Sequence, residues 1–413
     1  MTVENKKKIL FYAAVTLMFM TSMSKVLIPN TVFDELQSDL GISGQKLAAM
    51  GSAFMCTYAI SQLALGLLSS KYGGVRVLLF ASSVFTVGCV CFPFLSSANL
   101  MIADRALTGL GAGTAFIAVA KLTDDLFKKN FSMVLGIVLF LTYFGPVTGN
   151  LPMVAVVKAT SWRSAMMIPA AVSLLLFVII LICLKGTLKP VLKGNAITPL
   201  LKICSDKNSW LIFTASSVVF GSYYFIATTA GNKMLTDIGK MKPLHASLII
   251  TAFALIVAFN NIFGNIFLIK VLHERRKLMM FLAGLSHTAG TMLCACAFYF
   301  DMNCIFIIAG FLLISIPAGL FSIYCTVIKE LNPPEYTGLA IAILNFFAFV
   351  AIAGWGYIAG VIFSRFESGT ISGSVHYPPT VYALIFAIFA AFAIIGFICS
   401  CFLPETAAHN SQK

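Results

Sequence analysis

Long apolar runs separated by short polar breaks dominate the hydropathy pattern of this chain. A helix that crosses a bilayer needs about 20 mostly apolar residues, because the hydrocarbon core is about 30 Å thick and a helix rises about 1.5 Å per residue. Twelve segments meet this requirement, and each predicts one membrane span. Their expected boundaries are 9–29, 44–69, 75–96, 99–121, 131–156, 163–184, 209–230, 246–269, 278–299, 303–327, 337–363 and 380–402.

The secondary structure of these runs follows from the solvent around them. Only α-helices and closed β-barrels satisfy all backbone hydrogen bonds inside lipid, and the runs are too long and too evenly apolar for barrel strands. The first run follows Lys6–Lys8, as the apolar region of a signal peptide would, but it extends from Ile9 to about Pro29. It is longer than such a region and no small-x-small cleavage site follows, so we expect it to remain as a first span.

Basic residues are distributed unevenly among the breaks. With both termini on the inner side, the inner segments carry nineteen Lys and Arg residues and the outer segments carry seven. Positive residues accumulate in cytoplasmic loops. We therefore expect both termini and the central loop 185–207 to be cytoplasmic.

This central loop is the longest inner break, and six predicted spans lie on each side of it. Pro190 and Pro199 prevent a helix from continuing across it. The pattern predicts an all-α membrane protein of twelve transmembrane helices, with six-helix bundles at 1–184 and 208–413. Two such bundles around a site near the membrane midplane are typical of secondary transporters.

Composition supports the membrane class, since 59% of the residues are apolar and 10% are charged. A soluble domain carries about 25% charged residues, so too few polar side chains remain to cover a water-facing surface. The net charge of +13 is spread over short breaks. Nucleic-acid binding requires a clustered basic face, and we expect no nucleic-acid partner.

The eleven cysteines lie mostly inside apolar runs, and none forms a C-x-x-C pair. A buried free Cys behaves as a small hydrophobic residue, so we expect no disulfide, no metal site and no cofactor. The sequence also shows no Ser/His/Asp set and no phosphate-binding loop. We therefore expect neither an enzyme nor an ATP-driven pump.

The break after the second span carries a recognisable motif. Residues 66–76 read G-L-L-S-S-K-Y-G-G-V-R, with Gly66, Ser70, Lys71, Gly73 and Arg76 at the defining positions. This stretch resembles the signature G-x-L-a-D-r-x-G-r-r-r of the major facilitator superfamily in the same loop. The resemblance implies that Gly66 permits close approach of two helices and that Lys71 and Arg76 contact neighbouring helix ends. Ser70 stands where the family usually has Asp, so the charge relay proposed for the signature lacks its acid here.

Further motifs follow in order at the expected spans. They are Arg105-x-x-x-Gly109-x-Gly111-x-Gly113 in span four, Gly145-Pro146-x-x-Gly149-Asn150 in span five, Trp162-Arg163 at span six and Leu403-Pro404-Glu405-Thr406 after span twelve. The first is similar to the family's R-x-x-x-G-x-G motif, and the second partly matches a G-P-x-x-G-G motif often found in exporters. Pro146 between two glycines predicts a kink in span five. The resemblance covers essentially the whole chain and implies the major facilitator fold.

Within the superfamily, two stretches resemble organic-anion transporters. They are Y-A-I-S-Q-L-A-L-G at 58–66 and G-L-G-A-G-T-A-F at 109–116. This resemblance makes Tyr58 and Gln62 candidate substrate-binding residues. In many of those transporters a Glu thought to take part in proton coupling stands at the position of Ala112, and an acid often stands at that of Ser24. Both acids are absent here.

Two cations lie within predicted spans. Lys25 is about four residues inside the outer end of span one, and Arg105 is about six residues inside that of span four. An ionisable residue at membrane depth is costly and indicates a functional site. Thr21 and Ser22 share the helix face of Lys25, so we expect all four residues to bind an anionic head group. Alternatively, Lys25 extends to the outer interface, and Arg105 pairs with Asp104 or caps helix ends.

Other polar side chains within the spans are weaker candidates. Tyr223 and Tyr224 lie in span seven, which commonly lines the cavity in this superfamily, and Asn345 lies in span eleven. Aromatic packing and hydrogen bonds between helices are the alternative roles. Asp104 and His287 are the only titratable candidates for proton coupling. The lack of other acids favours facilitated diffusion or solute exchange.

Together these features predict a secondary active or facilitative transporter that moves a small organic anion or amphoteric nutrient by alternating access, as a symporter, an antiporter or a uniporter. We expect a monomer in the inner membrane of a bacterium. A drug or metabolite exporter is the alternative indicated by the partial motif in span five. A transporter-like sensor or receptor is a third hypothesis, favoured by Ser70 in place of Asp.

The charge distribution makes the topology testable. With the native cysteines removed and Gly194→Cys introduced into the central loop, a membrane-impermeant thiol reagent should label inside-out vesicles and leave intact cells unlabelled. The reason is the excess of positive residues on that side of the membrane. Labelling of Gly194→Cys in intact cells would contradict the predicted topology.

Overall fold

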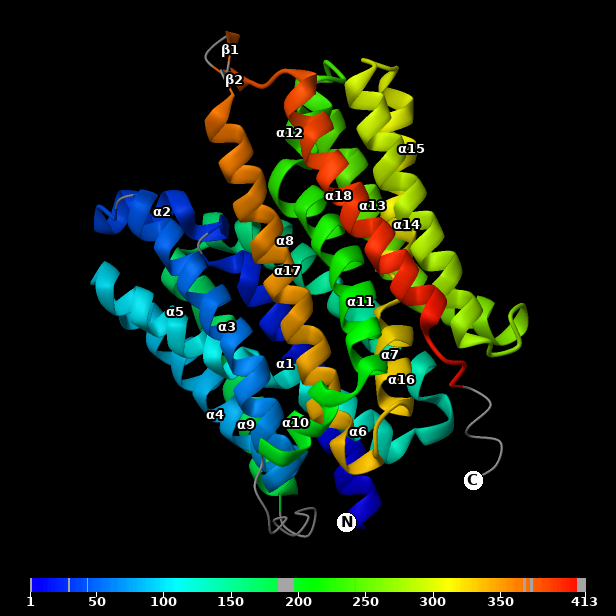
Figure 1. The fold of residues 1–413 in the computed structure, drawn as a ribbon. Helices are drawn as coiled ribbons and strands as arrows, with labels where there is room; N and C mark the ends of the chain where they lie inside the picture. The colour runs from blue at the N-terminus through cyan, green and yellow to red at the C-terminus, as the bar shows by residue number, and fades with distance from the viewer. Residues whose placement is uncertain are drawn as a thin grey trace. The chain divides into compact units, whose positions relative to one another are not determined.

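The computed structural model describes residues 2–28, 30–42, 44–184, 197–241, 243–366, 369–371 and 374–406. These residues are almost all helical (Figure 1). The chain divides into two compact units. The N unit comprises Met1–Ile203 with Asn332–Phe346, and the C unit comprises Cys204–Leu331 with Phe347–Lys413.

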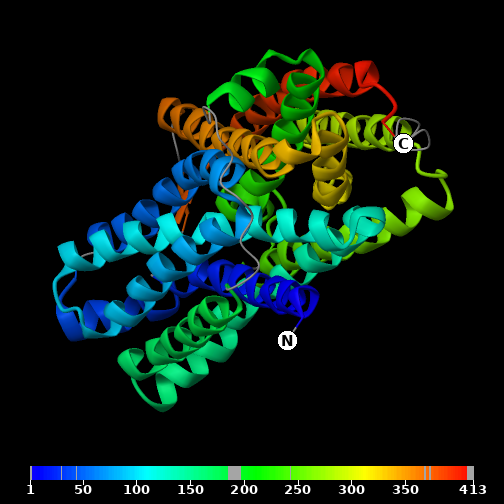
Figure 2. The same ribbon diagram turned by 90° about the horizontal axis from the view of Figure 1, so that it is seen from below.

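The N unit is built from helices of very different lengths. They are α1 (Val3–Leu27), α2 (Phe33–Leu40), α3 (Gly44–Tyr72), α4 (Gly74–Cys91), α5 (Ala98–Ala112), α6 (Thr114–Leu126), α7 (Phe131–Thr142), α8 (Phe144–Ala159), α9 (Trp162–Cys183), most of α10 (Ile197–Ser205) and the first part of α17 (Thr337–Arg365). Short 3-10 turns lie at Asn30–Val32, Phe92–Phe94, Lys128–Asn130 and Pro334–Tyr336. Helix α1 packs against α6, α8 and α9, and Figure 2 shows it among them.

The C unit contains the remaining elements. They are α11 (Lys207–Phe225), a π-helical turn at Ile226–Ala230, α12 (Gly231–Asp237), α13 (Pro243–Lys270), α14 (Arg276–Tyr299), α15 (Cys304–Ala318), α16 (Phe321–Glu330), the rest of α17, and α18 (Pro379–Phe402). Strands β1 (Gly369–Ile371) and β2 (Ser374–His376) form a small antiparallel hairpin between α17 and α18, which the sequence pattern did not indicate. Helix α14 packs against α15 and α18, and α11 packs against α18 (Figure 1).

The helices coincide with the predicted spans, and the all-α membrane class is confirmed. Eleven helical segments of the described residues are long and apolar enough to cross a membrane. The seventh predicted span, 209–230, falls on α11 and the π turn and is not among the eleven. The total of twelve spans therefore stays a prediction, as do the bundle boundaries at 184 and 208. Residues 332–346, expected in the second bundle, cluster with the N unit.

Three predicted spans are interrupted. Span four breaks at Gly113 between α5 and α6, span five at Tyr143 between α7 and α8, and span ten at Gly319 between α15 and α16. Pro146 lies in the first turn of α8, where its missing N–H costs no helical hydrogen bond. The kink expected near Pro146 therefore takes the form of a break between two helices.

The motif glycines lie where helices approach closely. A methyl group on Gly113 would overlap the Ser61 hydroxyl of α3, and one on Gly109 would overlap the Phe54 carbonyl oxygen of the same helix. In α8, methyl groups at Gly145 and Gly149 would lie 2.8 Å from the carbonyl oxygens of Phe19 and Met23 of α1. Small residues promote membrane helix association by allowing such backbone contact.

The motif after span two joins helix ends. Gly73 has φ of 84° in the turn between α3 and α4, a conformation that favours glycine. Arg76 Nη1 donates a 2.8 Å hydrogen bond to the Tyr72 carbonyl oxygen at the end of α3. A methyl group on Gly66 would overlap the Ala342 side chain of α17. The side chains of Ser70 and Lys71 lie outside the described residues.

The motif after α18 closes one end of the C unit. The Glu405 carboxylate accepts hydrogen bonds from the backbone N–H groups of Arg276 (3.0 Å) and Lys277 (3.2 Å), at the start of α14. An acidic group at a helix N-terminus satisfies N–H groups that have no partner within the helix. Arg276 also pairs with Glu330 at 2.8 Å, and the Thr406 hydroxyl donates to Glu330. Glu405 and Thr406 thereby join the chain end to α14 and α16.

The close approach at Gly66 predicts a stability effect. Gly66→Ala should lower the free energy of unfolding by about 1–3 kcal/mol, because the added methyl group has no room beside Ala342. In a double-mutant cycle, Gly66→Ala with Ala342→Gly should be less destabilised than the sum of the single variants. Unfolding of the detergent-purified protein, followed by circular dichroism, measures both effects.

Gly354→Ala on α17 is the matched control, since a methyl group there meets no atom within 4 Å. Additive single-variant effects, or an equal loss at Gly354, would contradict the contact between α3 and α17.

Candidate functional site

Lys25 lies in the last turn of α1, where its side chain turns toward α3. Its Nζ is 3.9 Å from the centroid of the Tyr58 ring, and Tyr58 is only 6% exposed. An ammonium group over an aromatic face is attracted by the ring quadrupole, more strongly where water is excluded. The charge of Lys25 is thus held against a buried ring.

A second ring extends this contact. Phe54 and Tyr58 are one helical turn apart on α3, and their rings stack with centroids 6.2 Å apart and an interplanar angle of 13°. The Arg105 Cζ of α5 lies 4.3 Å from the Phe54 centroid. Lys25, Tyr58, Phe54 and Arg105 form what we term the cation–aromatic row. Sequence reasoning missed Phe54, although its spacing of four from Tyr58 was a usable signal.

Arg105 is 1% exposed and holds the end of α1. Its Nη1 donates to the Ser24 hydroxyl at 3.0 Å, and its Nη2 donates to the carbonyl oxygens of Ser24 (3.0 Å) and Ile28 (3.1 Å). The last carbonyl groups of a helix lack partners and carry partial negative charge, so a cation stabilises them. Its Nε has no hydrogen-bond partner among the described residues.

Asp104 lies beside Arg105 and is also buried. Its carbonyl oxygen accepts a 2.8 Å hydrogen bond from the Thr108 hydroxyl, which lies 3.5 Å from its carboxylate. Ser24, Asp104, Arg105 and Thr108 line a cavity of about 20 Å³. This volume is enough for about one water molecule. A solute would therefore need the cavity to widen before it contacted either charge.

Two side-chain amides lie beside the Tyr58 phenol of the cation–aromatic row. Tyr58 and Gln62 lie one turn apart on α3, and the Tyr58 hydroxyl is near the side-chain amides of Gln62 and Asn345 of α17. Gln62 is fully buried, and neither its nitrogen nor its oxygen makes a hydrogen bond within the part of the chain that the structure describes. A buried polar group without a partner costs about 1–3 kcal/mol. Gln62 is therefore a buried amide beside the Tyr58 hydroxyl whose hydrogen-bonding capacity is not fully used.

Thr21 and Ser22 lie one turn before Lys25 on α1. The Thr21 hydroxyl donates to the Met18 carbonyl oxygen at 2.8 Å, so its proton is used within the helix. Ser22 lies against α8 at Gly145. The structure thus brings Lys25, Tyr58, Gln62 and Asn345 together. Thr21 is instead hydrogen-bonded within α1, and Ser22 lies in the contact between α1 and α8.

The remaining candidates belong to the C unit. Tyr223 is buried in α11, with its ring edge-on to that of half-buried Tyr224 at 5.4 Å. His287 Nε2 lies 3.1 Å from the Ser222 hydroxyl, which itself donates to the Val218 carbonyl oxygen at 2.9 Å. The tautomer of His287 decides which of the two atoms donates in this pair. His287 Nδ1 has no partner among the described residues.

Among the described residues, no group of three or more His, Cys, Asp or Glu side chains is placed to hold a metal ion.

Comparison with known proteins gives a consistent picture. A sequence profile described as "Major Facilitator Superfamily" matches residues 10–236. A solved structure, the "proton:xylose symporter XylE bound to 6-bromo-6-deoxy-D-glucose", superimposes with a TM-score of 0.65 at 13% identity, covering 98% of this chain and 96% of that chain. At this identity the structural likeness shows the fold alone.

Curated relatives match over shorter stretches. "Probable sulfoacetate transporter SauU" of Cupriavidus necator is 27% identical over 142 residues, which are 34% of this chain and 33% of that protein. "Multidrug resistance protein MdtL" of Shewanella oneidensis is 28% identical over 158 residues, 37% of this chain and 39% of that protein. "Multidrug resistance protein D" of Escherichia coli is 27% identical over 95 residues, 23% of this chain and 24% of that protein. The alignments thus span about a quarter to two fifths of these relatives.

The contacts of Arg105 predict a structural effect. Arg105→Lys keeps the charge but loses the fork that reaches two carbonyl oxygens, so the free energy of unfolding should fall by about 1.5–3 kcal/mol. Ser24→Ala, which removes one hydroxyl and leaves both carbonyl contacts, should cost less. Chemical denaturation followed by circular dichroism compares the variants. An Arg105→Lys protein as stable as its parent would show that Arg105 does not hold α1.

Proposed function

The chain belongs to the major facilitator superfamily, and we propose that it is a secondary transporter that carries a small organic anion or amphoteric nutrient across the membrane by alternating access. The observation that carries this proposal is the cluster in which Lys25 lies over the Tyr58 ring and the Gln62 amide lies beside the Tyr58 hydroxyl. A Lys within a membrane-spanning helix is expensive and is usually retained for function. A solute bearing a carboxylate or sulfonate and a second polar group would engage both side chains.

The two cations take different parts in this proposal. Arg105 has three donated hydrogen bonds to the end of α1 and lies beside a cavity of about 20 Å³, which supports a role in positioning α1. Lys25 is half-buried, and its ammonium group lies over Tyr58, which supports direct attraction of the anion. Tyr58, Gln62 and Asn345 would then supply the neutral polar contacts.

The relatives support two substrate classes. One relative is named for sulfoacetate, an anion, which agrees with a cationic site. Two others are named for multidrug resistance, and with the partial motif at Gly145–Asn150 they favour export of a drug or metabolite as the second candidate. The chemistry of the Lys25 region favours the anion. We further propose a monomer in a bacterial inner membrane, with both termini cytoplasmic.

Binding to the purified protein tests the solute class. In a thermal-shift screen of carboxylates, sulfonates, phosphates, amino acids and sugars, a small anion should raise the unfolding temperature, because a ligand that binds only the folded state stabilises it. Lys25→Gln should weaken binding of that anion roughly tenfold to a hundredfold, since the lost interaction involves a charged group. Lys25→Arg, which keeps the charge, is the matched control. A neutral or cationic ligand that binds parent and Lys25→Gln equally would refute the anion hypothesis.

Uptake into proteoliposomes tests transport and coupling together. We propose facilitated diffusion or exchange, because Asp104 and His287 are the only titratable coupling candidates in the predicted spans. An imposed pH gradient should then drive no accumulation of the anion. Accumulation lost in Asp104→Asn or His287→Gln would assign a proton route to that residue, whereas accumulation that persists in both would place coupling elsewhere. Binding of the anion without any flux would indicate a sensor.

A further inference from the structure

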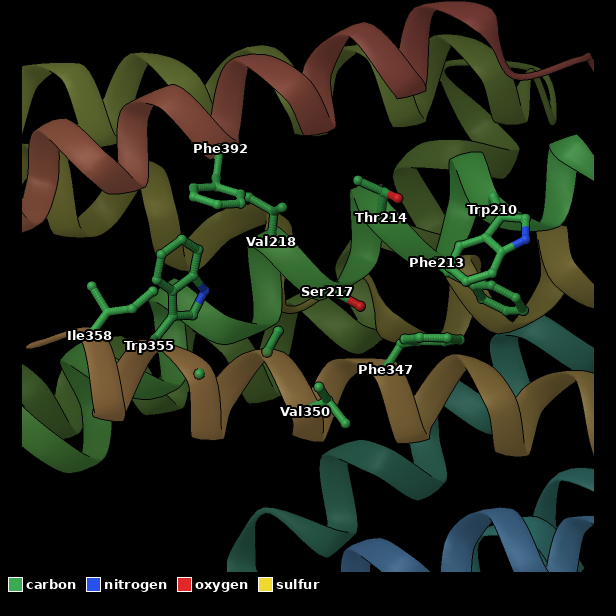
Figure 3. Close-up of a pocket in the computed structure, with 12 residues that line it drawn as sticks. Trp210, Phe213, Thr214, Ser217, Val218, Phe347, Val350, Trp355, Ile358 and Phe392 are labelled. Carbon is green, nitrogen blue, oxygen red and sulfur yellow. The ribbon is translucent and has the colours of Figure 1, made fainter. Parts of the chain in front are cut away.

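A recess of about 300 Å³ lies in the C unit between α11, α17 and α18. Figure 3 shows Phe213 and Ser217 from α11, Phe347 and Trp355 from α17, and Phe392 from α18 around it. Gly354 of α17 also lines it, and a methyl group added there would meet no atom within 4 Å. The residues of the recess belong to the C unit, whereas Lys25 and its neighbours belong to the N unit.

The recess opens toward lipid. Phe392 is 42% exposed and shares one face of α18 with Leu384 and Ile395, which are exposed as well. An exposed apolar stripe on a membrane-spanning helix faces the hydrocarbon. Val350 and Trp210, on the walls of the recess, are also exposed. A molecule dissolved in the bilayer therefore reaches the recess sideways, without crossing water.

The walls specify a neutral ligand. None of the twelve lining residues is charged, and five of them are aromatic. A volume of about 300 Å³ is at the lower end of the range for small-molecule pockets, which are mostly apolar with a few placed polar groups. This chemistry differs from that of the Lys25 region, where a cation dominates.

Two polar atoms of the lining residues lack hydrogen-bond partners among the described residues. They are the Ser217 Oγ and the Trp355 Nε1, and Trp355 is only 4% exposed. Figure 3 shows the Ser217 hydroxyl pointing from α11 toward α17, and the indole nitrogen of Trp355 on the side of its ring that faces α11. The Trp355 nitrogen packs against Gly221 of α11. The Ser217 hydroxyl lies in the wall of the recess, where a hydrocarbon chain would leave it unsatisfied and a ligand oxygen would accept from it.

We propose that this recess is a binding site for a neutral, mainly aromatic or aliphatic solute that carries one hydrogen-bond acceptor and enters from the bilayer. The apolar body lies against Phe213, Phe347 and Phe392, and the acceptor faces Ser217. The proposal does not depend on the anion that the N unit binds.

Tryptophan fluorescence reports on the recess directly, because Trp210 and Trp355 line it and the third tryptophan, Trp162, lies in the N unit. The full chain in lipid nanodiscs is titrated with 6-bromo-2-acetylnaphthalene. A separate titration uses its alkene analogue, 6-bromo-2-isopropenylnaphthalene, in which a methylene group replaces the carbonyl oxygen. Both should quench the fluorescence saturably, and the ketone should bind about fivefold more tightly, as expected for one hydrogen bond.

Variants separate the recess from general partitioning into lipid. Ser217→Ala should abolish the preference for the ketone, because it removes the donor that faces the recess. Ser216→Ala is the matched control, since its hydroxyl donates to the Phe213 carbonyl oxygen at 3.1 Å and does not line the recess. Gly354→Leu should fill the space and remove saturable quenching. Circular dichroism checks that each variant is folded.

Three results would overturn the proposal. One is quenching that rises linearly with either compound, which is partitioning only. Another is equal affinity of the parent protein for the ketone and its alkene analogue. The third uses nanodiscs of phosphatidylcholine with brominated acyl chains, which quench the tryptophan fluorescence themselves. The ketone without bromine is then added. If it fails to relieve this quenching, a lipid chain is the occupant.

Discussion

Hydrocarbon offers no hydrogen-bond partner, and this constraint explains the placement of nearly every polar side chain in the structure. Arg105 donates to the hydroxyl of Ser24 and to the free carbonyl oxygens at the end of α1. Asn265 donates to the Asn261 carbonyl oxygen at 2.7 Å and to the Ser322 hydroxyl at 2.8 Å. Few buried side-chain atoms of the described residues lack a partner, and those of Gln62 and Ser217 lie at the two proposed sites.

The same constraint gives aromatic rings a polar role. Lys25 and Arg105 lie against Tyr58 and Phe54, where ring faces replace part of the hydration that each cation has lost. The two rings are stacked on one face of α3, so a shift of that helix would alter the surroundings of both charges. Glycines at 109 and 113 allow α5 to approach α3 closely enough to place Arg105 over Phe54. Packing and electrostatics are therefore coupled in the N unit.

The two candidate sites differ in chemistry and in access. The Lys25 region offers a cation and neutral amides, which suit a small anion in water. The recess of the C unit offers aromatic walls and uncharged donors beside a lipid-facing stripe, which suit a neutral solute from the bilayer.

Sequence alone determined the class of the protein and the approximate extent of most membrane spans, because membrane thickness sets the length of an apolar run. It did not show the breaks at Gly113, Tyr143 and Gly319. It also singled out Lys25 and Arg105, since charge at membrane depth is conspicuous. Only the tertiary structure showed that Arg105 holds α1, that Phe54 joins the two cations, and that Gln62 and Asn345 lie beside the Tyr58 hydroxyl. These facts depend on contacts between helices distant in the chain, which helical periodicity does not encode. The recess was likewise invisible, because its walls read as ordinary apolar positions on three separate spans.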